Sequence, residues 1–262
     1  MAQQDGIYLK KKFGQHFLKD TTFVDKMLAQ VPLDSTTNVF EIGGGSGILT
    51  RAILGKPIAR LWVFEIDPEW VTQLQAIDDK RLTVYNQDFL TVNFDIFNEH
   101  APWVLLANLP YQITFAVLYM VQAHRELFRD GVVMIQEEVA QKIVKTSGRG
   151  YGFHALFLQH YFDWQLLDKV PPAAFYPAPK IFSRLLYFKP KSVLSVIPDA
   201  EKFWLFIKDC FRQPRRTLRN NLAHTAYSLT NIDSKILGLR AQQLSMNDFL
   251  VLWEHVHTFS QK

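Results

Sequence analysis

Short apolar runs alternate with amphipathic stretches along the first two thirds of the chain. The stretch 20–31 has helical spacing, because apolar residues recur at i, i+3, i+4 and i+7 behind Asp20, which can cap a helix. Strands separated by helices are typical of βαβ units and of a mostly parallel sheet, whose strands end at one shared edge. The apolar runs predict strands over 38–42, 61–66, 81–85, 103–107, 132–135, 164–170 and 182–188.

The pattern changes near Lys189-Pro190-Lys191. From Asp199 onward, apolar residues fall on one helical face, and a last helix is predicted from Ser245, with Asp248 completing a capping pair. We therefore predict two domains, an α/β domain over 1–189 and a small all-helical domain over 190–262.

Composition narrows the class of protein. Of 262 residues, 48% are hydrophobic and 21% are charged, a balance that can bury a full core and excludes wholesale disorder. The single cysteine, Cys210, excludes an intramolecular disulfide and a cysteine-based metal cluster, and it fits a reducing compartment. The polar start of the chain and the lack of an apolar stretch of about 18 residues argue against a signal peptide and a membrane span. We expect a cytoplasmic protein without a bound metal.

The net charge of +4 is unevenly distributed. Residues 1–140 carry 12 Lys/Arg and 17 Asp/Glu, whereas residues 141–219 carry 14 Lys/Arg and five Asp/Glu, a local charge of +9. So basic a segment suggests a polyanionic partner. A solvated surface without a binding role explains the same count, and charge alone does not separate the two.

A glycine-rich turn and two acids suggest a nucleoside pocket. The turn, 43–47, follows a predicted strand and opens a predicted helix, so the backbone can approach a ligand closely. Glu65 ends the next strand and can accept both ribose hydroxyl hydrogens, and Asp88 can accept from an adenine amino group. By itself, the glycine turn is compatible with binding of a dinucleotide cofactor, with binding of S-adenosylmethionine, or with an ordinary tight turn that binds nothing. Its combination with the two acids favours a site for a nucleoside.

The tetrapeptide Asn108-Leu109-Pro110-Tyr111 directly follows the fourth predicted strand, at the edge where ligands bind. Pro110 restricts the local backbone and would hold the Asn108 amide and the nearby carbonyls in place. These oxygens can accept both hydrogens of an exocyclic amine and leave its lone pair nucleophilic, while Tyr111 can stack on the base. The alternative is a proline-containing turn with a packed tyrosine. The position of the tetrapeptide behind a predicted nucleoside pocket favours an amino-methyltransferase.

These motifs, in this order, resemble the ribosomal RNA adenine N6,N6-dimethyltransferase family. The resemblance is closer to its small-subunit (16S) branch than to its macrolide-resistance branch, and it runs from about Lys11 to Leu222. The matching stretches are 13–18, 41–50, 65–67, 87–88, 108–111, 136–140, 151–152, 175–180 and 215–222.

The resemblance implies a Rossmann-like methyltransferase sheet with a seventh, antiparallel strand, followed by a helical RNA-binding domain. It implies S-adenosylmethionine as methyl donor and two adjacent adenosines in the 3′-terminal hairpin loop of 16S rRNA, in an assembling 30S subunit, as substrate. We expect a monomer. The predicted cofactor-binding residues are His16, Leu18, Gly43, Gly45, Glu65, Asp88 and Asn108. The residues predicted around the adenine are Asn108, Leu109, Pro110, Tyr111 and Phe175.

Phosphate contacts are predicted for seven basic side chains, although each one taken singly fits a solvated helix face. They are Lys142, Lys145, Arg149, Arg212, Arg215, Arg216 and Arg219. The adjacent acids Glu137 and Glu138 are predicted to be structural.

Four positions depart from the family pattern. His16 stands for Asn, Gly44 for Pro, Pro214 for Arg and Phe182 for Asp. We expect a changed donor contact at His16, a looser turn at Gly44 and a helix break at Pro214. None of the four removes a residue needed for methyl transfer.

Three rival functions remain open at this point. A nicotinamide-dependent oxidoreductase explains the glycine turn and Glu65 but not the tetrapeptide. A non-enzymatic RNA- or DNA-binding factor explains the basic segment but not the pocket. A DNA adenine methyltransferase shares the tetrapeptide chemistry, but the basic C-terminal motif favours structured RNA. Binding of a methyl donor without binding of nicotinamide separates the first rival from a methyltransferase.

Overall fold

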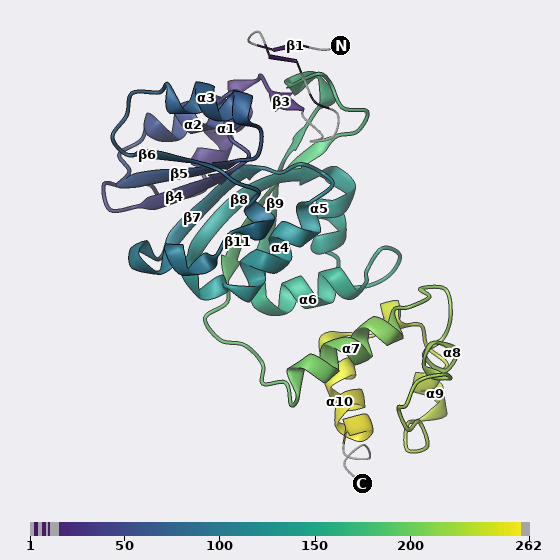
Figure 1. The fold of residues 1–262 in the computed structure, drawn as a ribbon. Coiled ribbons are helices and arrows are strands. Elements are labelled where there is room, and N and C mark those ends of the chain that lie inside the picture. Colours follow the sequence, from purple (N-terminus) through teal and green to yellow (C-terminus); the bar gives the residue numbers. More distant parts are fainter. Residues whose placement is uncertain (1–2, 5–6, 9, 11–15, 258–262) are drawn as a thin grey trace. The chain divides into compact units, whose positions relative to one another are not determined.

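The computed structural model describes residues 3–4, 7–8, 10 and 16–257 (Figure 1). The chain divides into two compact units, which are described separately below. The first unit contains residues 1–140 and 162–190, and the second contains residues 141–161 and 191–262.

A seven-stranded sheet forms the centre of the first unit. In spatial order its strands are β6 (Leu82–Asn86), β5 (Arg60–Glu65), β4 (Asn38–Ile42), β7 (Trp103–Asn108), β8 (Phe128–Gln136), β11 (Ser183–Pro190) and β9 (Phe162–Val170). The first five are mutually parallel, and β11 runs antiparallel to both of its neighbours. The predicted Rossmann-like α/β sheet with an antiparallel strand is confirmed.

Helices cover both faces of this sheet, and the two faces carry different side chains. On β4, Val39 belongs to an aliphatic core that α1, α2 and α3 share, whereas Phe40 packs against Phe64 and Phe97. Figure 1 shows α1, α2 and α3 on one side of the sheet and α4 on the other. The helices are α1 (Thr21–Leu28), α2 (Ile48–Leu54), α3 (Pro68–Gln75), α4 (Thr114–Ala123) and α5 (Glu137–Ile143), with 3-10 turns η2 (Phe89–Thr91), η3 (Phe94–His100), η4 (Arg125–Leu127) and η5 (Pro172–Ala174).

Two small antiparallel ribbons accompany the sheet. β1 (Gln3–Gln4) pairs with β2 (Ile7–Tyr8), and β3 (Phe17–Leu18) pairs with β10 (Phe175–Tyr176). In the second ribbon Leu18 lies opposite Phe175, so segments far apart in the sequence meet at the same end of the sheet.

The second unit is built from helices around an apolar core. Its elements are α6 (Phe153–Tyr161), α7 (Ala200–Cys210), α8 (Leu218–Leu222), α9 (Ser234–Leu237), η6 (Ala241–Gln243) and α10 (Met246–His257). Asp199 caps α7, and the Ser245 hydroxyl donates to Asp248 at 2.7 Å before α10, as the capping signals predicted. The helix that follows Asp199 ends at Cys210, four residues before Pro214.

The observed division of the chain differs from the predicted one. The break at 190/191 lies one residue from the predicted boundary, but residues 141–161 group with the C-terminal helices and not with the sheet. They do so because Tyr151, Ala155 and Leu156 are buried in the same core as residues of α7 and α10.

Across the part of the chain that the structure describes, no helix is long and apolar enough to cross a membrane.

Candidate functional site

A cavity of about 330 Å³ opens at the carboxyl ends of β4, β5 and β7. Ten of the eleven residues predicted for the cofactor and the adenine line it: His16, Gly43, Gly45, Glu65, Asp88, Asn108, Leu109, Pro110, Tyr111 and Phe175. Leu18 is not among the lining residues, because its side chain is 4% exposed and belongs to the aliphatic core. No Lys or Arg lines the cavity within the described residues, so its walls offer hydrogen-bond acceptors and apolar surface.

The glycine turn after β4 brings backbone close to the cavity. Gly45 has a φ of +51°, and a side chain there would collide with the ring of Phe17. At Gly44 a Cβ atom would lie 2.6 Å from Val63 Cγ1 and 2.7 Å from Leu74 Cδ1. Gly44 is therefore a tightly packed position, which does not support the looser turn expected from the absence of proline.

Glu65 ends β5 and joins two segments of the site. Its Oε2 accepts a hydrogen bond from Gly45 N at 2.9 Å, and its Oε1 accepts one from Asp67 N at 2.8 Å. Burial raises the pKa of this carboxyl, while the hydrogen bonds from Asp67 N and Gly45 N oppose the rise. Because each carboxylate oxygen can accept about two hydrogen bonds, both oxygens keep capacity for ligand hydroxyls.

Asp88 follows β6 on the same edge of the sheet. Its Oδ1 accepts a hydrogen bond from Leu90 N at 2.9 Å, which caps the turn η2 and fixes the carboxylate at the cavity wall. Next to it, Gln87 N donates to the Glu65 carbonyl at 3.1 Å. The two predicted nucleoside contacts are thus held by neighbouring strands.

The Asn108 amide is oriented by the segment that carries His16. Asn108 Nδ2 donates to the His16 carbonyl at 3.3 Å, and Asn108 Oδ1 has no hydrogen-bond partner among the described residues. The amide nitrogen is thereby used within the protein, and the oxygen is left as an acceptor at the cavity.

The two carbonyls that follow Asn108 differ in availability. The Pro110 carbonyl accepts from Ile113 N at 3.2 Å and from Thr114 Oγ1 at 3.3 Å. The Leu109 carbonyl has no such partner in the described part of the chain. The second acceptor for an amine is therefore better assigned to Leu109 than to Pro110.

Tyr111 is fixed at both ends of its ring. Its hydroxyl lies 2.8 Å from Ser183 Oγ on β11, and its ring stacks near His16, with centroids 6.1 Å apart and planes at 27°. His16 Nδ1 in turn lies 2.7 Å from the Pro177 carbonyl, so Nδ1 carries the hydrogen. Burial raises the pKa of the Tyr111 hydroxyl, so it stays neutral. A planar polar ring is thus held at the cavity beside Asn108.

Several residues that line the cavity were not predicted from the sequence. Phe17, Ile66 and Gln112 line the cavity, but none was assigned a role. Ile66 had a usable signal, since it follows Glu65 at a strand end and its side chain is 42% exposed. Phe17 lies between the predicted residues His16 and Leu18, and its place at the cavity depends on the pairing of β3 with β10.

Glu137 has a structural partner. Arg184 donates to both of its carboxylate oxygens, at 2.6 and 2.8 Å, and to the Leu167 carbonyl at 2.7 Å. The pair ties the start of α5 to β11, in line with the structural role predicted for Glu137.

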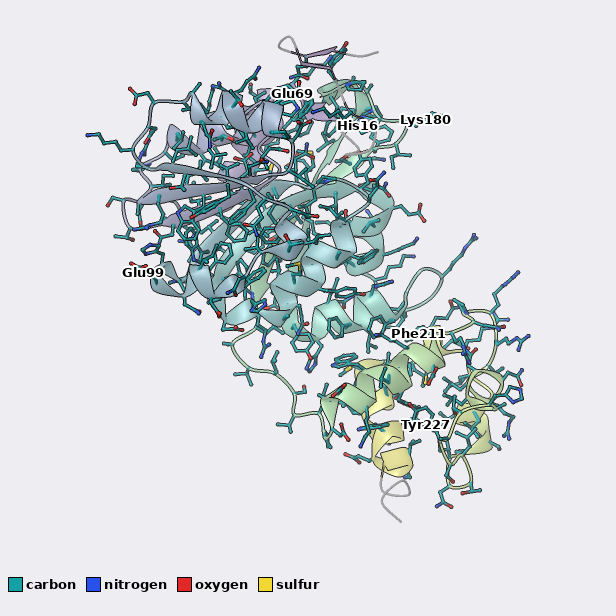
Figure 2. The ribbon with its side chains drawn as sticks, viewed as in Figure 1. His16, Glu69, Glu99, Lys180, Phe211 and Tyr227 are labelled. Atoms are coloured by element: carbon teal, nitrogen blue, oxygen red, sulfur yellow. The ribbon has the colours of Figure 1, made fainter. Side chains whose placement is uncertain are left out.

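All seven residues predicted to contact phosphate lie in the second unit, and all are exposed. Figure 2 shows nitrogen-tipped side chains extending from the loop between α5 and α6 and from the region around α8. Asn221 organises the turn before α8: its buried amide donates to the Cys210 carbonyl at 2.7 Å and to the Gln213 carbonyl at 3.2 Å. This turn carries Arg212, Arg215 and Arg216.

The described residues contain no group of three or more His, Cys, Asp or Glu side chains that could hold a metal ion.

Comparison with known proteins adds independent findings. The family model described as "Ribosomal RNA adenine dimethylase" matches residues 7–253. The "Ribosomal RNA small subunit methyltransferase A" of Syntrophotalea carbinolica is 36% identical over 248 residues, covering 92% of this chain and 94% of the relative. The protein of the same name from Mycoplasma mobile is 34% identical over 252 residues, covering 93% and 96%.

Two solved structures share the fold over nearly the full length. A dimethyladenosine transferase from Plasmodium falciparum superposes with a TM-score of 0.79 at 22% identity, covering 94% of this chain and 98% of that one. The 23S rRNA methyltransferase ErmE gives a TM-score of 0.71 at 22% identity, covering 92% and 99%. With a family model that spans most of its length and relatives more than 30% identical along that length, the chain belongs to the ribosomal RNA adenine dimethylase family.

Proposed function

We propose that this protein is an S-adenosylmethionine-dependent enzyme that adds two methyl groups to N6 of each of two adjacent adenosines in 16S rRNA. The proposed substrate is the 3′-terminal hairpin loop, in the 30S subunit or its precursor in the cytoplasm. The observation that carries the proposal is the Asn108 amide, whose nitrogen is held by the His16 carbonyl and whose oxygen is left as an acceptor at the cavity.

The cavity residues fit the methyl donor. Glu65 has acceptor capacity for the two ribose hydroxyls, and Asp88 can accept from the adenine amino group of the cofactor. The sulfonium group of the ligand carries a positive charge. A cavity whose described lining residues offer hydrogen-bond acceptors and no Lys or Arg side chain favours such a group. When bound, S-adenosylmethionine supplies the methyl group. The chain supplies binding, orientation and exclusion of water.

The target base has to leave its stack to reach such a cavity. Tyr111 and Phe175 are the rings proposed to hold it, and stacking on an aromatic side chain is worth about 1–3 kcal/mol per base. The Ser183 hydroxyl keeps the Tyr111 ring in one orientation. The Tyr111 side chain therefore loses little conformational entropy when the base binds.

Asn108 Oδ1 and the Leu109 carbonyl are proposed to accept the two hydrogens of the N6 amine. Accepting both hydrogens draws the nitrogen lone pair out of conjugation with the ring and aims it at the methyl donor. Catalysis then rests mainly on proximity and orientation. After transfer the amine is acidic and loses its proton to water, so no strong base is required of the chain.

The second unit is proposed to dock the rRNA. Its exposed basic residues contact phosphates of the rRNA, and the contribution of these contacts to RNA affinity falls as the salt concentration rises. The protein is proposed to act as a monomer.

The test uses 30S subunits that lack the modification, incubated with the protein and labelled S-adenosylmethionine, followed by nucleoside mass spectrometry. We expect N6,N6-dimethyladenosine at two adjacent positions near the 3′ end of 16S rRNA. Label at other positions of 16S rRNA, or no label transfer at all, would contradict the proposal.

A further inference from the structure

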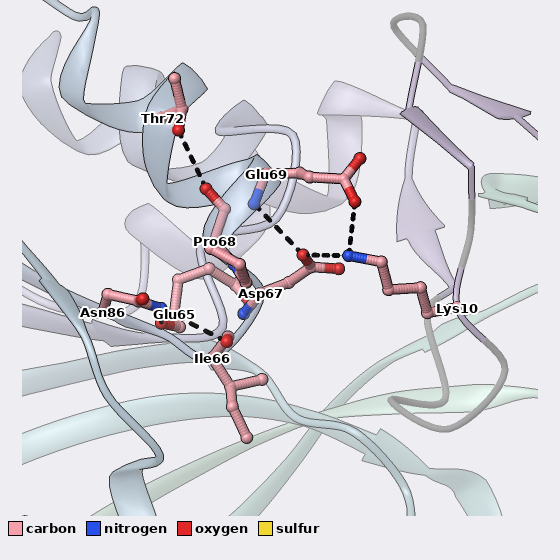
Figure 3. Close-up of polar contacts among 8 residues, drawn as sticks. All are labelled: Lys10, Glu65, Ile66, Asp67, Pro68, Glu69, Thr72 and Asn86. Atoms are coloured by element: carbon pink, nitrogen blue, oxygen red, sulfur yellow. Dashed lines mark hydrogen bonds and ion pairs between the residues drawn. The ribbon is translucent and has the colours of Figure 1, made fainter.

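Three charged side chains meet beside the cavity, outside its lining (Figure 3). Lys10 Nζ lies 2.6 Å from Asp67 Oδ1 and 2.7 Å from Glu69 Oε1. The Asp67 side chain is fully buried, that of Lys10 is 29% exposed and that of Glu69 is half exposed. We call Lys10, Asp67 and Glu69 the Lys10 cluster. An ammonium group placed on a buried carboxylate offsets a charge that water does not reach.

The Lys10 cluster is joined to the predicted ribose acceptor. Asp67 caps α3 by accepting from Glu69 N at 3.2 Å, and Asp67 N donates to Glu65 Oε1 at 2.8 Å. The other Glu65 oxygen accepts from Gly45 N. A continuous set of contacts therefore runs from Lys10 through Asp67 to Glu65 and the glycine turn, as Figure 3 shows for its first part.

The charges in this set act on one another. The negative charge of Asp67 adds to burial in raising the pKa of the Glu65 carboxyl. Hydrogen bonds to Asp67 and Glu69 raise the pKa of Lys10, so Lys10 keeps its positive charge at neutral pH. Removing that charge takes the Lys10 ion pair away from Asp67, whose negative charge acts on Glu65.

We propose that Lys10 is a positioning residue for cofactor binding, holding Asp67 and through it Glu65 in the ionised, ribose-accepting arrangement. This inference rests on the proposed function, because it assigns the same cavity to a nucleoside with free ribose hydroxyls.

The experiment measures S-adenosylmethionine affinity by isothermal titration calorimetry as a function of pH. It compares the wild type with Lys10→Met, Lys10→Arg and the control Lys26→Met, whose ion pair with Asp168 lies outside the cavity lining. The titratable and charged groups around Glu65 and its Asp67 contact are Glu41, Asp67, Glu69, Asp88, Lys10 and His16.

Lys10→Met should raise the Kd for S-adenosylmethionine about three- to tenfold near neutral pH. The substitution removes the positive charge of the ion pair, and a smaller fraction of Glu65 is then ionised. The excess over wild type should grow as the pH is lowered, because Glu65 binds a proton more readily without Lys10 nearby. Lys10→Arg should restore the affinity, and Lys26→Met should leave it unchanged.

A double variant separates positioning from general stability. If Lys10 acts through Glu65, Lys10→Met should cost little further affinity in a Glu65→Gln background. Lys10→Gln replaces Lys10→Met if the latter does not fold. Equal Kd values for wild type and the neutral variants across the pH range would overturn this inference alone. Absence of cofactor binding by the wild type would overturn the proposed function and this inference with it.

Discussion

The two units differ most in where they place charge. The first holds 16 Lys/Arg and 19 Asp/Glu, and its buried acids are Glu41, Glu65, Asp67 and Asp130. The second holds 13 Lys/Arg and six Asp/Glu, and its one buried polar side chain in the described chain is the neutral Asn221. The first unit therefore buries acidic side chains, among them Glu65 in the cavity wall, and the second exposes positive charge to solvent.

This difference matches two ligands of opposite sign. A sulfonium cofactor is favoured by acceptors in a site of low dielectric constant, where a Lys or Arg in the cavity lining would repel it. A folded RNA is favoured by exposed cations that displace counterions. If the division of labour is right, changes in one unit should leave the ligand of the other unaffected.

The largest effect is expected at Asn108. Asn108→Ala removes the oriented acceptor for N6, and we expect kcat to fall by about 10² or more, the cost of losing one oriented hydrogen-bonding group in an active site. Affinity for 30S subunits should stay within about twofold, since the RNA-facing charges are intact. Single-turnover kinetics and filter binding measure the two quantities. Asn98→Ala, at an exposed position of η3, is the control. Near-normal turnover of Asn108→Ala would remove Asn108 from the mechanism.

Glu65→Gln should weaken the cofactor and not the RNA. The amide keeps the size of the side chain but loses an acceptor and a charge, so Kd for S-adenosylmethionine should rise about tenfold or more. In the wild type, burial raises the pKa of Glu65, so affinity should fall as the pH is lowered and the carboxyl is protonated. Calorimetry over a pH series checks both, with Glu126→Gln as an exposed control. Unchanged affinity would argue against a ribose contact.

Substitutions of basic residues in the second unit should weaken the RNA and not the cofactor. Replacing Arg215, Arg216 and Arg219 together by Ala should weaken 30S binding and reduce the slope of log K against log salt by about two to three. Cofactor affinity should not change. Replacing Lys19, Lys56 and Lys80 of the first unit removes the same number of exposed charges and serves as the control. Equal losses in the two triple variants would mean that net charge alone drives binding.

The remaining effect concerns the stability of the first unit and not ligand binding. Burial raises the pKa of Glu41 to about 8, although Thr50 Oγ1 donates to it at 2.7 Å. Because the folded pKa lies above the unfolded one, the folded state holds this proton more tightly. The resulting stability is full below about pH 4.5 and is lost as the pH rises to about 8, at no more than about 1.4 kcal/mol per pH unit. Urea unfolding over this range should show the fall for wild type and a smaller one for Glu41→Gln. Identical pH slopes would contradict a buried neutral Glu41.

Local patterns were enough for the elements and for much of the cavity. Apolar runs predicted the strands, helical spacing predicted α1 and α10, and strand-end placement brought Glu65, Asp88 and Asn108 to one edge. Contacts between segments distant in sequence were not predictable in this way. Phe17 enters the cavity through pairing with Tyr176, and Lys10 reaches Asp67 across 57 positions. Residues 141–161 group with the C-terminal core because of where Tyr151 packs, which no local period reveals.

A structure of the protein with adenosine and an unreactive sulfonium analogue of the cofactor would show directly how the target base is held. We expect the adenosine N6 within about 3.2 Å of both Asn108 Oδ1 and the Leu109 carbonyl, facing the sulfonium carbon. An adenosine bound with N6 turned away from these two oxygens would contradict this expectation.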